Sequence, residues 1–217
     1  MAESGQAIKT GKKTQNFYDQ IAEVHNFALR INGYRASVAK YLKSLDLNIG
    51  PYSYVLDAGS GTGIVTLGMI DAGLRPKRMI ALDLSLNSLK IGQEEFEKTP
   101  SSAETISPVQ GNILTLPFAD DTFDLVATCG VLEYVDLDAG LREFARVIKP
   151  GGKLVLIPVK PGLVGSVLEL LYKFKIHPLD KVEGIARRYF NIVGNHEFPI
   201  SEPIAWSKTI FLLEKKP

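Results

Sequence analysis

The amino-acid sequence predicts an α/β protein in which helices cover both faces of a doubly wound, mostly parallel sheet. Three observations support this fold class. A short apolar run ends on Asp57 and is followed by glycines at every second position, five apolar segments alternate with helical patterns, and a polar residue stands at the end of several of those segments. Such alternation implies right-handed crossovers, and the ligand crevice of such a sheet lies at the carboxyl ends of its strands.

Length and composition favour one domain in a reducing compartment. The chain has 217 residues, of which 45% are hydrophobic, so it can bury one substantial core. Its 25 Lys and Arg residues balance 24 Asp and Glu residues, which gives no bulk attraction to nucleic acid or to an anionic membrane. The single cysteine, Cys129, excludes an internal disulfide framework. We therefore expect a cytoplasmic protein without a transmembrane segment.

The N-terminal region predicts a flexible tail followed by two helices. Residues 1–15 are polar and lack the apolar core of a secretory signal. Apolar residues then recur at helical spacing over residues 16–33, and a second helix is predicted from residue 34 to about residue 45.

These two helices allow two interpretations. In the first, residues 16–47 form a helical cover over the ligand and bring Tyr18 or His25 to the site. In the second, they are an amphipathic layer packed on the sheet, and for His25 taken alone we favour this interpretation.

The glycine-rich segment, residues 59–63, predicts a strand that turns sharply into a helix. Glycine tolerates positive φ angles and has no Cβ atom, so alternate glycines let a ligand approach the backbone N–H groups. The dinucleotide-binding fingerprint would need a glycine where this chain has Ile64. Asp57, two residues before the first glycine, would repel phosphates and attract an ammonium group. A purely structural turn remains the alternative for this segment alone.

A second apolar run, Arg78 to Asp83, predicts a buried strand that ends on a carboxylate. Asp83 lies twenty residues beyond Gly63, and an acidic residue at about that distance can accept hydrogen bonds from both vicinal hydroxyls of a ribose. The alternative is a cap for the following helix, residues 86–98. Ser85 suits that cap better, which leaves Asp83 free for a ribose.

A third strand is predicted over residues 105–110 and ends at Gly111. The next residues, Asn112 and Ile113, therefore fall at the same edge of the sheet. The Asn112 amide can bond the edge of a purine while the Ile113 N–H group donates to a ring nitrogen. An ordinary turn asparagine is the commoner case for this residue type, and only the position at a strand end favours the purine.

A fourth buried strand is predicted over residues 122–128, and Cys129 with Gly130 begins the next turn. The segment that follows carries Glu133 and Tyr134 toward the same edge of the sheet. These residues therefore join the polar groups expected at the strand ends.

A helix and a fifth strand complete the alternation. The helical pattern runs from about residue 137 to residue 148 and stops at Lys149-Pro150-Gly151-Gly152. Residues 153–157 then form a short apolar run typical of a buried strand.

Four motifs occur along residues 16–157 in an order that is more specific than any of them alone. They are Val55-Leu56-Asp57-Ala58-Gly59-Ser60-Gly61-Thr62-Gly63, Asp83 at a strand end, Leu116-Pro117-Phe118 before Phe123-Asp124-Leu125-Val126, and Val147-Ile148-Lys149-Pro150-Gly151-Gly152. With these motifs the chain resembles the class I methyltransferases that depend on S-adenosylmethionine. It is similar in particular to the ubiquinone and menaquinone biosynthesis type, whose acceptors are small molecules.

The resemblance implies a seven-stranded, Rossmann-like sheet whose last two strands form an antiparallel hairpin. It also implies S-adenosylmethionine as the cofactor and S-adenosylhomocysteine as the product. The implied cofactor-binding positions are Asp57 near the methionine ammonium, the backbone of Gly59, Ser60, Gly61 and Gly63 along the methionine, Asp83 and Leu84 at the ribose, Asn112 and Ile113 at the adenine, and Cys129 with Gly130 on the methionine side.

One position departs from the family pattern. The family usually carries Asp where this chain has Asn112. An amide oxygen can still accept a hydrogen bond from the adenine amino group, so we expect cofactor binding to survive the change.

The C-terminal region, residues 158–217, is where proteins of this family differ, and we expect it to form the acceptor side. Apolar residues predict an amphipathic helix over residues 163–174 and a further helix over residues 185–189. Strands are predicted over residues 191–198 and 204–213. The first helix can be plain core, an apolar lid over a hydrophobic acceptor, or a surface that touches a membrane.

The sequence therefore predicts one methyltransferase domain, residues 16–217, that moves the methyl group of S-adenosylmethionine to a small-molecule acceptor, which can be hydrophobic, by direct displacement. Because the sulfonium is already activated, positioning should dominate catalysis. The candidates for a general base are Tyr18, His25, Glu133, Tyr134, His177 and His196, and we select the first three. Tyr18, His25 and Tyr134 are the candidates for contact with the acceptor.

Other candidate residues and functions are weaker. His177 and His196 fit surface or rim positions, and no zinc-binding spacing is visible, so we expect no metal. The rival functions are a methyltransferase that acts on RNA or protein and a non-catalytic partner subunit that binds S-adenosylmethionine. The near-neutral charge disfavours RNA, and Ile64 disfavours a nicotinamide oxidoreductase.

Overall fold

The computed structural model describes residues 33–99 and 105–217, and the statements below concern these ranges. The tail expected over residues 1–15 and all but the last residue of the first predicted helix lie outside the described residues, as do Tyr18 and His25.

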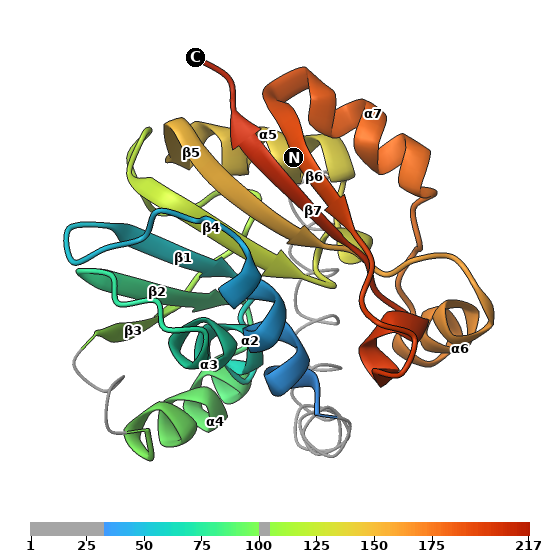
Figure 1. Cartoon of the computed structure of the whole chain (residues 1–217), viewed down its shortest axis with the longest axis horizontal. Helices are drawn as coiled ribbons and strands as arrows, with labels where there is room; N and C mark the ends of the chain where they lie inside the picture. The colour runs from blue at the N-terminus through green and yellow to red at the C-terminus, as the bar shows by residue number, and fades with distance from the viewer. Residues whose placement is uncertain (1–32, 100–104) are drawn as a thin grey trace, which may run out of the picture.

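One seven-stranded sheet forms the centre of the molecule (Figure 1). The strand order is β3-β2-β1-β4-β5-β7-β6, in which β7 runs antiparallel to both β5 and β6 while the other neighbouring pairs are parallel. This arrangement confirms the predicted fold class and its antiparallel C-terminal strands. The strands are β1 (Tyr54–Ala58), β2 (Arg78–Asp83), β3 (Ile106–Gln110), β4 (Phe123–Cys129), β5 (Ile148–Ile157), β6 (Phe190–His196) and β7 (Ile210–Lys215).

The central strands are apolar on both faces because helices cover both. Val55 and Leu56 of β1 point to opposite faces, and both are fully buried. Leu56 pairs with Ile80 of β2 on one side and with Val126 of β4 on the other. This register places β1 at the middle of the sheet, between two cores.

Three helices, α2 (Tyr34–Ser44), α3 (Ile64–Asp71) and α4 (Leu86–Glu97), cover one face of the sheet, and α5 (Leu137–Val147) and α7 (Leu179–Tyr189) cover the other (Figure 1). The start of α5 is fixed by a side-chain cap, in which the Asp136 carboxylate accepts a hydrogen bond from the Ala139 N–H group at 2.8 Å. A bidentate ion pair between Arg35 and Asp71 joins α2 to α3.

The loop that carries Leu116-Pro117-Phe118 is fixed to α5 by one guanidinium. Arg146 donates hydrogen bonds to the carbonyl oxygens of Leu116 and Phe118 and also pairs with Glu143. The Leu116 N–H group in turn donates to Glu143. This motif therefore orders the chain as it enters β4.

Three predicted boundaries differ from the structure. Strand β5 begins at Ile148 and not after Gly152, because Ile148 already pairs with Phe123 and an irregularity between Phe123 and Leu125 absorbs the extra residues. The strand predicted over residues 204–213 is partly wrong, because Pro203–Trp206 is a 3-10 helix, η2, that starts with a proline. Helix α7 is longer than predicted.

The direction in which the chain winds reverses at β1, since β2 and β3 lie on one side of it and β4 on the other. In sheets of this kind the ligand crevice opens beside the carboxyl ends of the two strands at the reversal, which are β1 and β4. No helix in the described ranges is both long enough and apolar enough to cross a membrane.

Candidate functional site

Two of the three glycines between β1 and α3 are required by close packing. Gly59 and Gly63 have φ angles of 76° and 83°. A Cβ atom on Gly59 would lie 2.3 Å from Val131 Cγ2, and one on Gly63 would lie 2.3 Å from Phe96 Cε1. A Cβ atom on Gly61 would meet no atom within 4 Å. Gly61 is therefore the glycine at which a ligand can come closest to the backbone.

The glycine loop is tied to the end of β2. The N–H groups of Gly59 and Ser60 both donate to the Leu82 carbonyl, at 2.7 and 2.9 Å. The Gly61 N–H group donates to Asp83 Oδ2 at 2.8 Å. The hydroxyl of Ser60 is buried and has no hydrogen-bond partner among the described residues. A buried hydroxyl of this kind usually has a partner, so a ligand atom is a natural one here.

Asp57, near the end of β1 and directly before the loop, is deeply buried, with 1% of its surface exposed. Its Oδ2 atom accepts a hydrogen bond from the Thr66 hydroxyl at 2.5 Å, while Oδ1 has no partner in the part of the chain that is described. Burial raises the pKa of Asp57 to about 7, the Thr66 hydrogen bond opposes this rise, and the nearby Asp83 charge adds to it. A donor from a ligand, above all a cationic one, would complete the bonding of Oδ1.

Asp83 lies at the end of β2, where the sequence placed a ribose contact. The expectation that Ser85 caps α4 is correct, since the Ser85 hydroxyl accepts a hydrogen bond from the Ser88 N–H group at 3.1 Å. The expectation that Asp83 is thereby left free is wrong, because its two oxygens accept from the N–H groups of Gly61 and Ser85, each at 2.8 Å. A carboxylate oxygen can accept more than one hydrogen bond, so both oxygens keep capacity for a ligand.

The expected purine contacts follow β3, beside Asp83. The Gly111 N–H group donates to the Asp83 carbonyl at 2.9 Å, which joins the two strand ends. Asn112 is exposed, and its side-chain oxygen accepts a hydrogen bond from the Leu114 N–H group at 2.9 Å. This is the turn asparagine that the sequence left as the alternative. Its amide N–H groups, not its oxygen, are best placed for a ligand, and the Ile113 side chain is buried in the core.

Leu84 and Cys129 complete the predicted cofactor set. Leu84 is partly exposed at the rim, directly after β2. Cys129 ends β4, and its sulfur lies 3.4 Å from the Tyr34 hydroxyl of α2. Burial raises the pKa of both the Cys129 thiol and the Tyr34 hydroxyl above their ordinary values. Both groups therefore stay neutral near pH 7.

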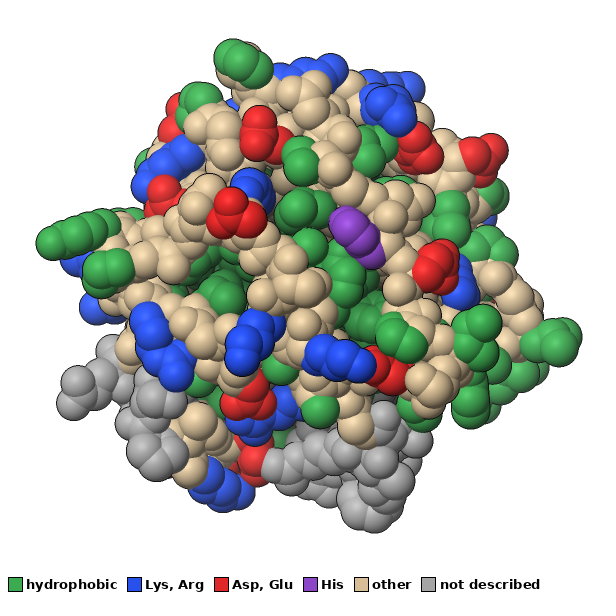
Figure 2. All heavy atoms as spheres, viewed as in Figure 1, with side chains coloured by type: hydrophobic (Ala, Val, Ile, Leu, Met, Phe, Trp, Pro, Cys, Tyr) green, Lys and Arg blue, Asp and Glu red, His purple; other side chains and the backbone are tan. Residues whose placement is uncertain are grey.

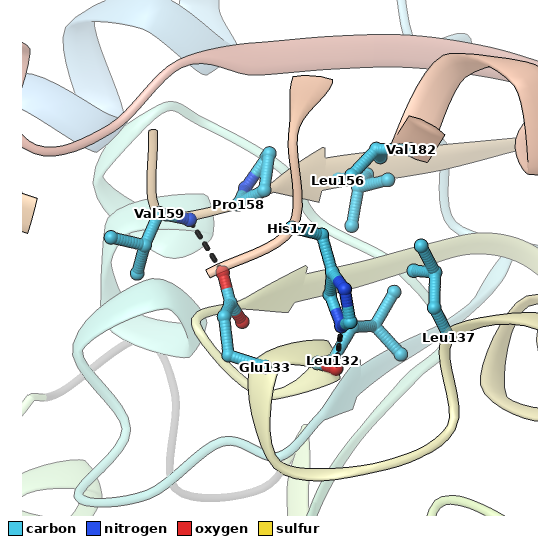
Figure 3. A pocket seen from close by; sticks show the side chains of 8 residues that line it. All are labelled: Leu132, Glu133, Leu137, Leu156, Pro158, Val159, His177 and Val182. Atoms are coloured by element: carbon cyan, nitrogen blue, oxygen red, sulfur yellow. Dashed lines mark hydrogen bonds between the residues drawn. The ribbon is translucent and has the colours of Figure 1, made fainter. Parts of the chain in front are cut away.

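Glu133 is buried beside β4, in the 3-10 helix η1 (Leu132–Tyr134). Figure 3 shows its carboxylate pointing at Val159, whose N–H group donates to Oε1 at 2.5 Å. The Oε2 atom has no partner within the described ranges. Glu133, a general-base candidate that the structure describes, therefore keeps one carboxylate oxygen that can accept a further hydrogen bond or a proton.

A cavity of about 10 Å³ lies between Glu133 and His177 (Figure 3). His177 Nε2 lies 3.3 Å from the Leu132 carbonyl oxygen, and its Nδ1 atom has no partner among the described residues. This volume is about that of one water molecule, and it is too small for a substrate.

The other predicted residues have mainly packing contacts. The Tyr134 ring packs edge-on against Phe174, with 5.3 Å between the ring centres, which places it beside the segment that follows α6 (Leu163–Tyr172). His196 packs edge-on against Tyr41 of α2, with 5.4 Å between the ring centres, and it is exposed, in agreement with the expected surface position.

Sequence reasoning missed two residues of this site. Tyr34 opens a predicted helix, and nothing in its spacing indicates that it reaches Cys129. Lys208 lies in a segment predicted as strand, yet only 8% of its surface is exposed. A Cβ atom on Gly130 would lie 2.7 Å from Lys208 Nζ, so the ammonium is next to the end of β4.

Buried oxygens that can still accept hydrogen bonds gather at the strand ends. Three buried oxygens with unfilled bonding capacity, Asp57 Oδ1, Ser60 Oγ and Glu133 Oε2, lie around the ends of β1 and β4. The described residues hold no cluster of three or more His, Cys, Asp or Glu side chains suited to a metal ion. A larger open hollow, about 410 Å³, lies beside residues 42–50 and 72–74, at the opposite edge of the sheet. The strand ends, and not this hollow, carry the buried oxygens that lack a partner among the described residues.

Comparison with known proteins matches this chain to a methyltransferase family model and to curated methyltransferases. The family model described as "Methyltransferase domain" matches residues 56–156. A demethylmenaquinone methyltransferase of Corynebacterium urealyticum is 38% identical over 132 residues, which cover 58% of this chain and 52% of that protein. This chain spans about half the length of the first curated relatives it matches.

Solved structures give the same fold. A geranyl diphosphate C-methyltransferase from Streptomyces coelicolor, complexed with Mg²⁺, geranyl-S-thiolodiphosphate and S-adenosyl-L-homocysteine, matches with a TM-score of 0.68 at 16% identity, over 82% of this chain and 74% of that one. A chain from the complex of the Haloferax volcanii Trm112 methyltransferase activator with a methyltransferase matches with a TM-score of 0.75 at 16% identity, over 94% and 98%. At these identities the likeness concerns the fold alone.

Proposed function

We propose that this chain, a class I S-adenosylmethionine-dependent methyltransferase similar to the menaquinone biosynthesis type, transfers the methyl group of that cofactor to a small apolar acceptor. The observation that carries the proposal is the set of unpaired buried oxygens at the ends of β1 and β4, inside the segment that matches the methyltransferase domain. This is the edge at which a sheet with this winding binds its ligand.

The residues at this edge fit the cofactor. The unpaired Asp57 Oδ1 suits the methionine ammonium, and the open space at Gly61 lets a ligand reach the backbone. We propose that the cofactor is held by Asp57, Gly59, Ser60, Gly61 and Gly63 at its methionine end, by Asp83 with Leu84 at the ribose, by Asn112 and Ile113 at the adenine, and by Cys129 along the methionine side.

The chain's own task in this reaction is mainly positioning. When bound, the cofactor supplies a methyl group that is already activated on a sulfonium. The Val159 N–H group fixes one oxygen of Glu133 and leaves the other to accept a proton from the acceptor. Glu133 is therefore the general base that we propose, and Tyr134 lies next to it in sequence, facing the acceptor side.

The exposed surface of α6 supports an apolar acceptor. Leu163 and Leu170 are 90% and 81% exposed, and Gly165 is the one buried residue of this helix. Hydrophobic side chains gather at this edge of the molecule (Figure 2), and Trp206 of η2 is also exposed. Plain core packing, one of the three interpretations of this segment, is therefore wrong.

We propose that this face rests on a lipid surface from which the acceptor enters. Exposed leucines and a tryptophan are typical of helices that lie in a membrane interface, and Lys173 and Lys175 directly after α6 add positive charge. A quinol-like acceptor would dissolve in that surface. We place the protein on the cytoplasmic side, in keeping with its single reduced cysteine.

Calorimetry and a transfer assay test this function. The purified chain is titrated with S-adenosylhomocysteine and then supplied with methyl-labelled S-adenosylmethionine and 1,4-naphthohydroquinone, total RNA or a mixture of peptides. Saturable binding and label in the naphthalene product are expected. Labelled RNA or peptide would instead support a macromolecular acceptor, and binding without any transfer would support a partner subunit.

The variant Asp83→Ala tests the cofactor site directly. Loss of a carboxylate that pairs with ligand hydroxyls is expected to weaken S-adenosylhomocysteine binding by about 1–3 kcal/mol. Asp83→Asn, which keeps one acceptor oxygen, should lose less. Unchanged affinity in Asp83→Ala would remove this residue from the ribose role.

A further inference from the structure

Lys208 carries an ammonium group beside the crevice that the proposed function does not use. The residue lies between η2 and β7, where its backbone N–H group donates to the Ile204 carbonyl at 2.9 Å and its main chain bridges to Val159. The whole residue is only 8% exposed. No hydrogen bond or ion pair reaches its Nζ atom from the rest of the described chain.

Most of the Lys208 side chain is held out of solvent, and no carboxylate of the described residues forms an ion pair with its ammonium. An ammonium in this position can form a charge-assisted hydrogen bond with an anionic oxygen that a ligand supplies. The position of Lys208 suits this role, since its Nζ atom lies against Gly130 at the end of β4. Any side chain on Gly130 would displace the ammonium, and its φ angle of 66° also favours glycine.

The groups around Lys208 carry charges of both signs. The positive charge of Lys208 lowers the pKa of the Cys129 thiol, while Glu133 and Asp57 raise it, so all three charged groups act on the same sulfur. Within residues 33–99 and 105–217, Asp57 and Glu133 each keep one oxygen without a hydrogen-bond partner, and neither forms an ion pair with Lys208. The crevice thus offers separate places for a cation and for an anion.

We propose that the Lys208 ammonium binds an anionic oxygen of the molecule held in the crevice. This inference rests on the proposed function, since the crevice is the methyltransferase site. Two sources supply such an oxygen: the α-carboxylate of the cofactor's methionine, and an ionised hydroxyl of the acceptor. Against the carboxylate, Lys208 and Asp57 would together hold a zwitterion. Against a phenolate, Lys208 would stabilise the ionised and more nucleophilic form of the acceptor.

The experiment compares two ligands that differ only in the carboxylate. Wild type, Lys208→Met and the charge-conserving Lys208→Arg are titrated with S-adenosylhomocysteine and with its decarboxylated analogue. If Lys208 binds the cofactor carboxylate, Lys208→Met loses tenfold or more in affinity for the first ligand and little for the second, and Lys208→Arg retains most of the binding. Such a cycle isolates one contact from general effects of the substitution.

A second arm addresses the acceptor. With S-adenosylhomocysteine bound, the same three proteins are titrated with 1,4-naphthohydroquinone at alkaline pH. If Lys208 binds the acceptor oxygen, S-adenosylhomocysteine has the same affinity for all three proteins, and so does its decarboxylated analogue. Lys208→Met then loses tenfold or more in affinity for 1,4-naphthohydroquinone.

The outcomes separate the two proposals. Equal behaviour of wild type and Lys208→Met in both arms overturns the role of Lys208, whereas wild type that binds neither cofactor analogue overturns the proposed function itself. Lys208→Met is not expected to unfold the protein, because the Lys208 side chain makes no hydrogen bond or ion pair with the described residues. If Lys208→Met nevertheless melts early, Lys208→Gln takes its place in both arms, and affinities of Lys208→Gln equal to those of wild type for both cofactor analogues and for the probe exclude Lys208.

Discussion

At the scale of single residues, burial decides what each polar group at the strand ends can do. Asp57 and Asp83 both follow apolar runs, yet Asp57 is buried with one unpaired oxygen while Asp83 binds two backbone N–H groups. The first is poised for a ligand cation, and the second holds the loop in shape. Asn112 differs again, since its exposed side chain closes a turn.

The raised pKa of Asp57 predicts a specific loss of stability with pH. The carboxyl has a pKa of about 7 when folded and about 3.9 when unfolded, so the folded state holds the proton more tightly. The free energy of unfolding should therefore fall as pH rises between these values, by about 3 kcal/mol from pH 5 to pH 8 without ligand.

Urea titrations at pH 5 and pH 8 check this expectation with Asp57→Asn, which removes the titration and should lose about 3 kcal/mol less than wild type over this range. Asp46→Asn, at an exposed carboxylate, is the matched control and should follow wild type. Parallel pH profiles for wild type and Asp57→Asn would contradict the raised pKa.

At the scale of elements, local sequence patterns predict that a helix or strand forms better than they predict whether it is buried or exposed. The helix beginning at Leu163 forms as predicted, but its apolar residues face outward because the sheet is already covered on both faces by α2, α3, α5 and α7. The strand predicted from residue 204 begins instead at Ile210, because Pro203 favours a helical turn over the same apolar residues.

The exposed face of α6 predicts binding to lipid vesicles. The double variant Leu163→Glu/Leu170→Glu should bind vesicles of phosphatidylglycerol and phosphatidylcholine much more weakly than wild type, because it places charges in the apolar interface. Its free energy of unfolding should change by no more than about 0.5 kcal/mol per site, since both side chains are already exposed.

Co-sedimentation measures this binding. Val193→Glu, at an exposed apolar residue of β6, is the control and should bind vesicles like wild type. Weak sedimentation of wild type itself, or equal binding by the double variant, would rule out α6 as the lipid contact.

At the scale of the whole molecule, the strand order brings the site together. Asp57 lies one residue before the end of β1, and Asp83 and Cys129 end β2 and β4. These three strands are neighbours in the sheet although they are separated along the chain. Because the site exists only when these strands are paired, a cofactor that binds there must stabilise the whole fold.

The coupling between cofactor binding and the stability of the fold can be measured. S-adenosylhomocysteine at one hundred times its dissociation constant should raise the free energy of unfolding by about 2.7 kcal/mol, as measured by urea titration. Adenosine at the same concentration, which lacks the methionine end, is the control and should stabilise less. Calorimetric binding without any stabilisation would mean that the ligand does not select the folded site.

The sequence by itself determined the sheet, the alternating helices and the places of Asp57, Asp83 and Cys129 at strand ends, because apolar periodicity and glycine turns act over a few neighbouring residues. Only the tertiary structure decided that Tyr34 reaches Cys129, that Lys208 reaches Gly130 and that α6 remains uncovered. These facts depend on which distant segments pack together. Burial shifts pKa values and leaves some polar groups without partners, and it is a property of the packed molecule that no local sequence pattern gives.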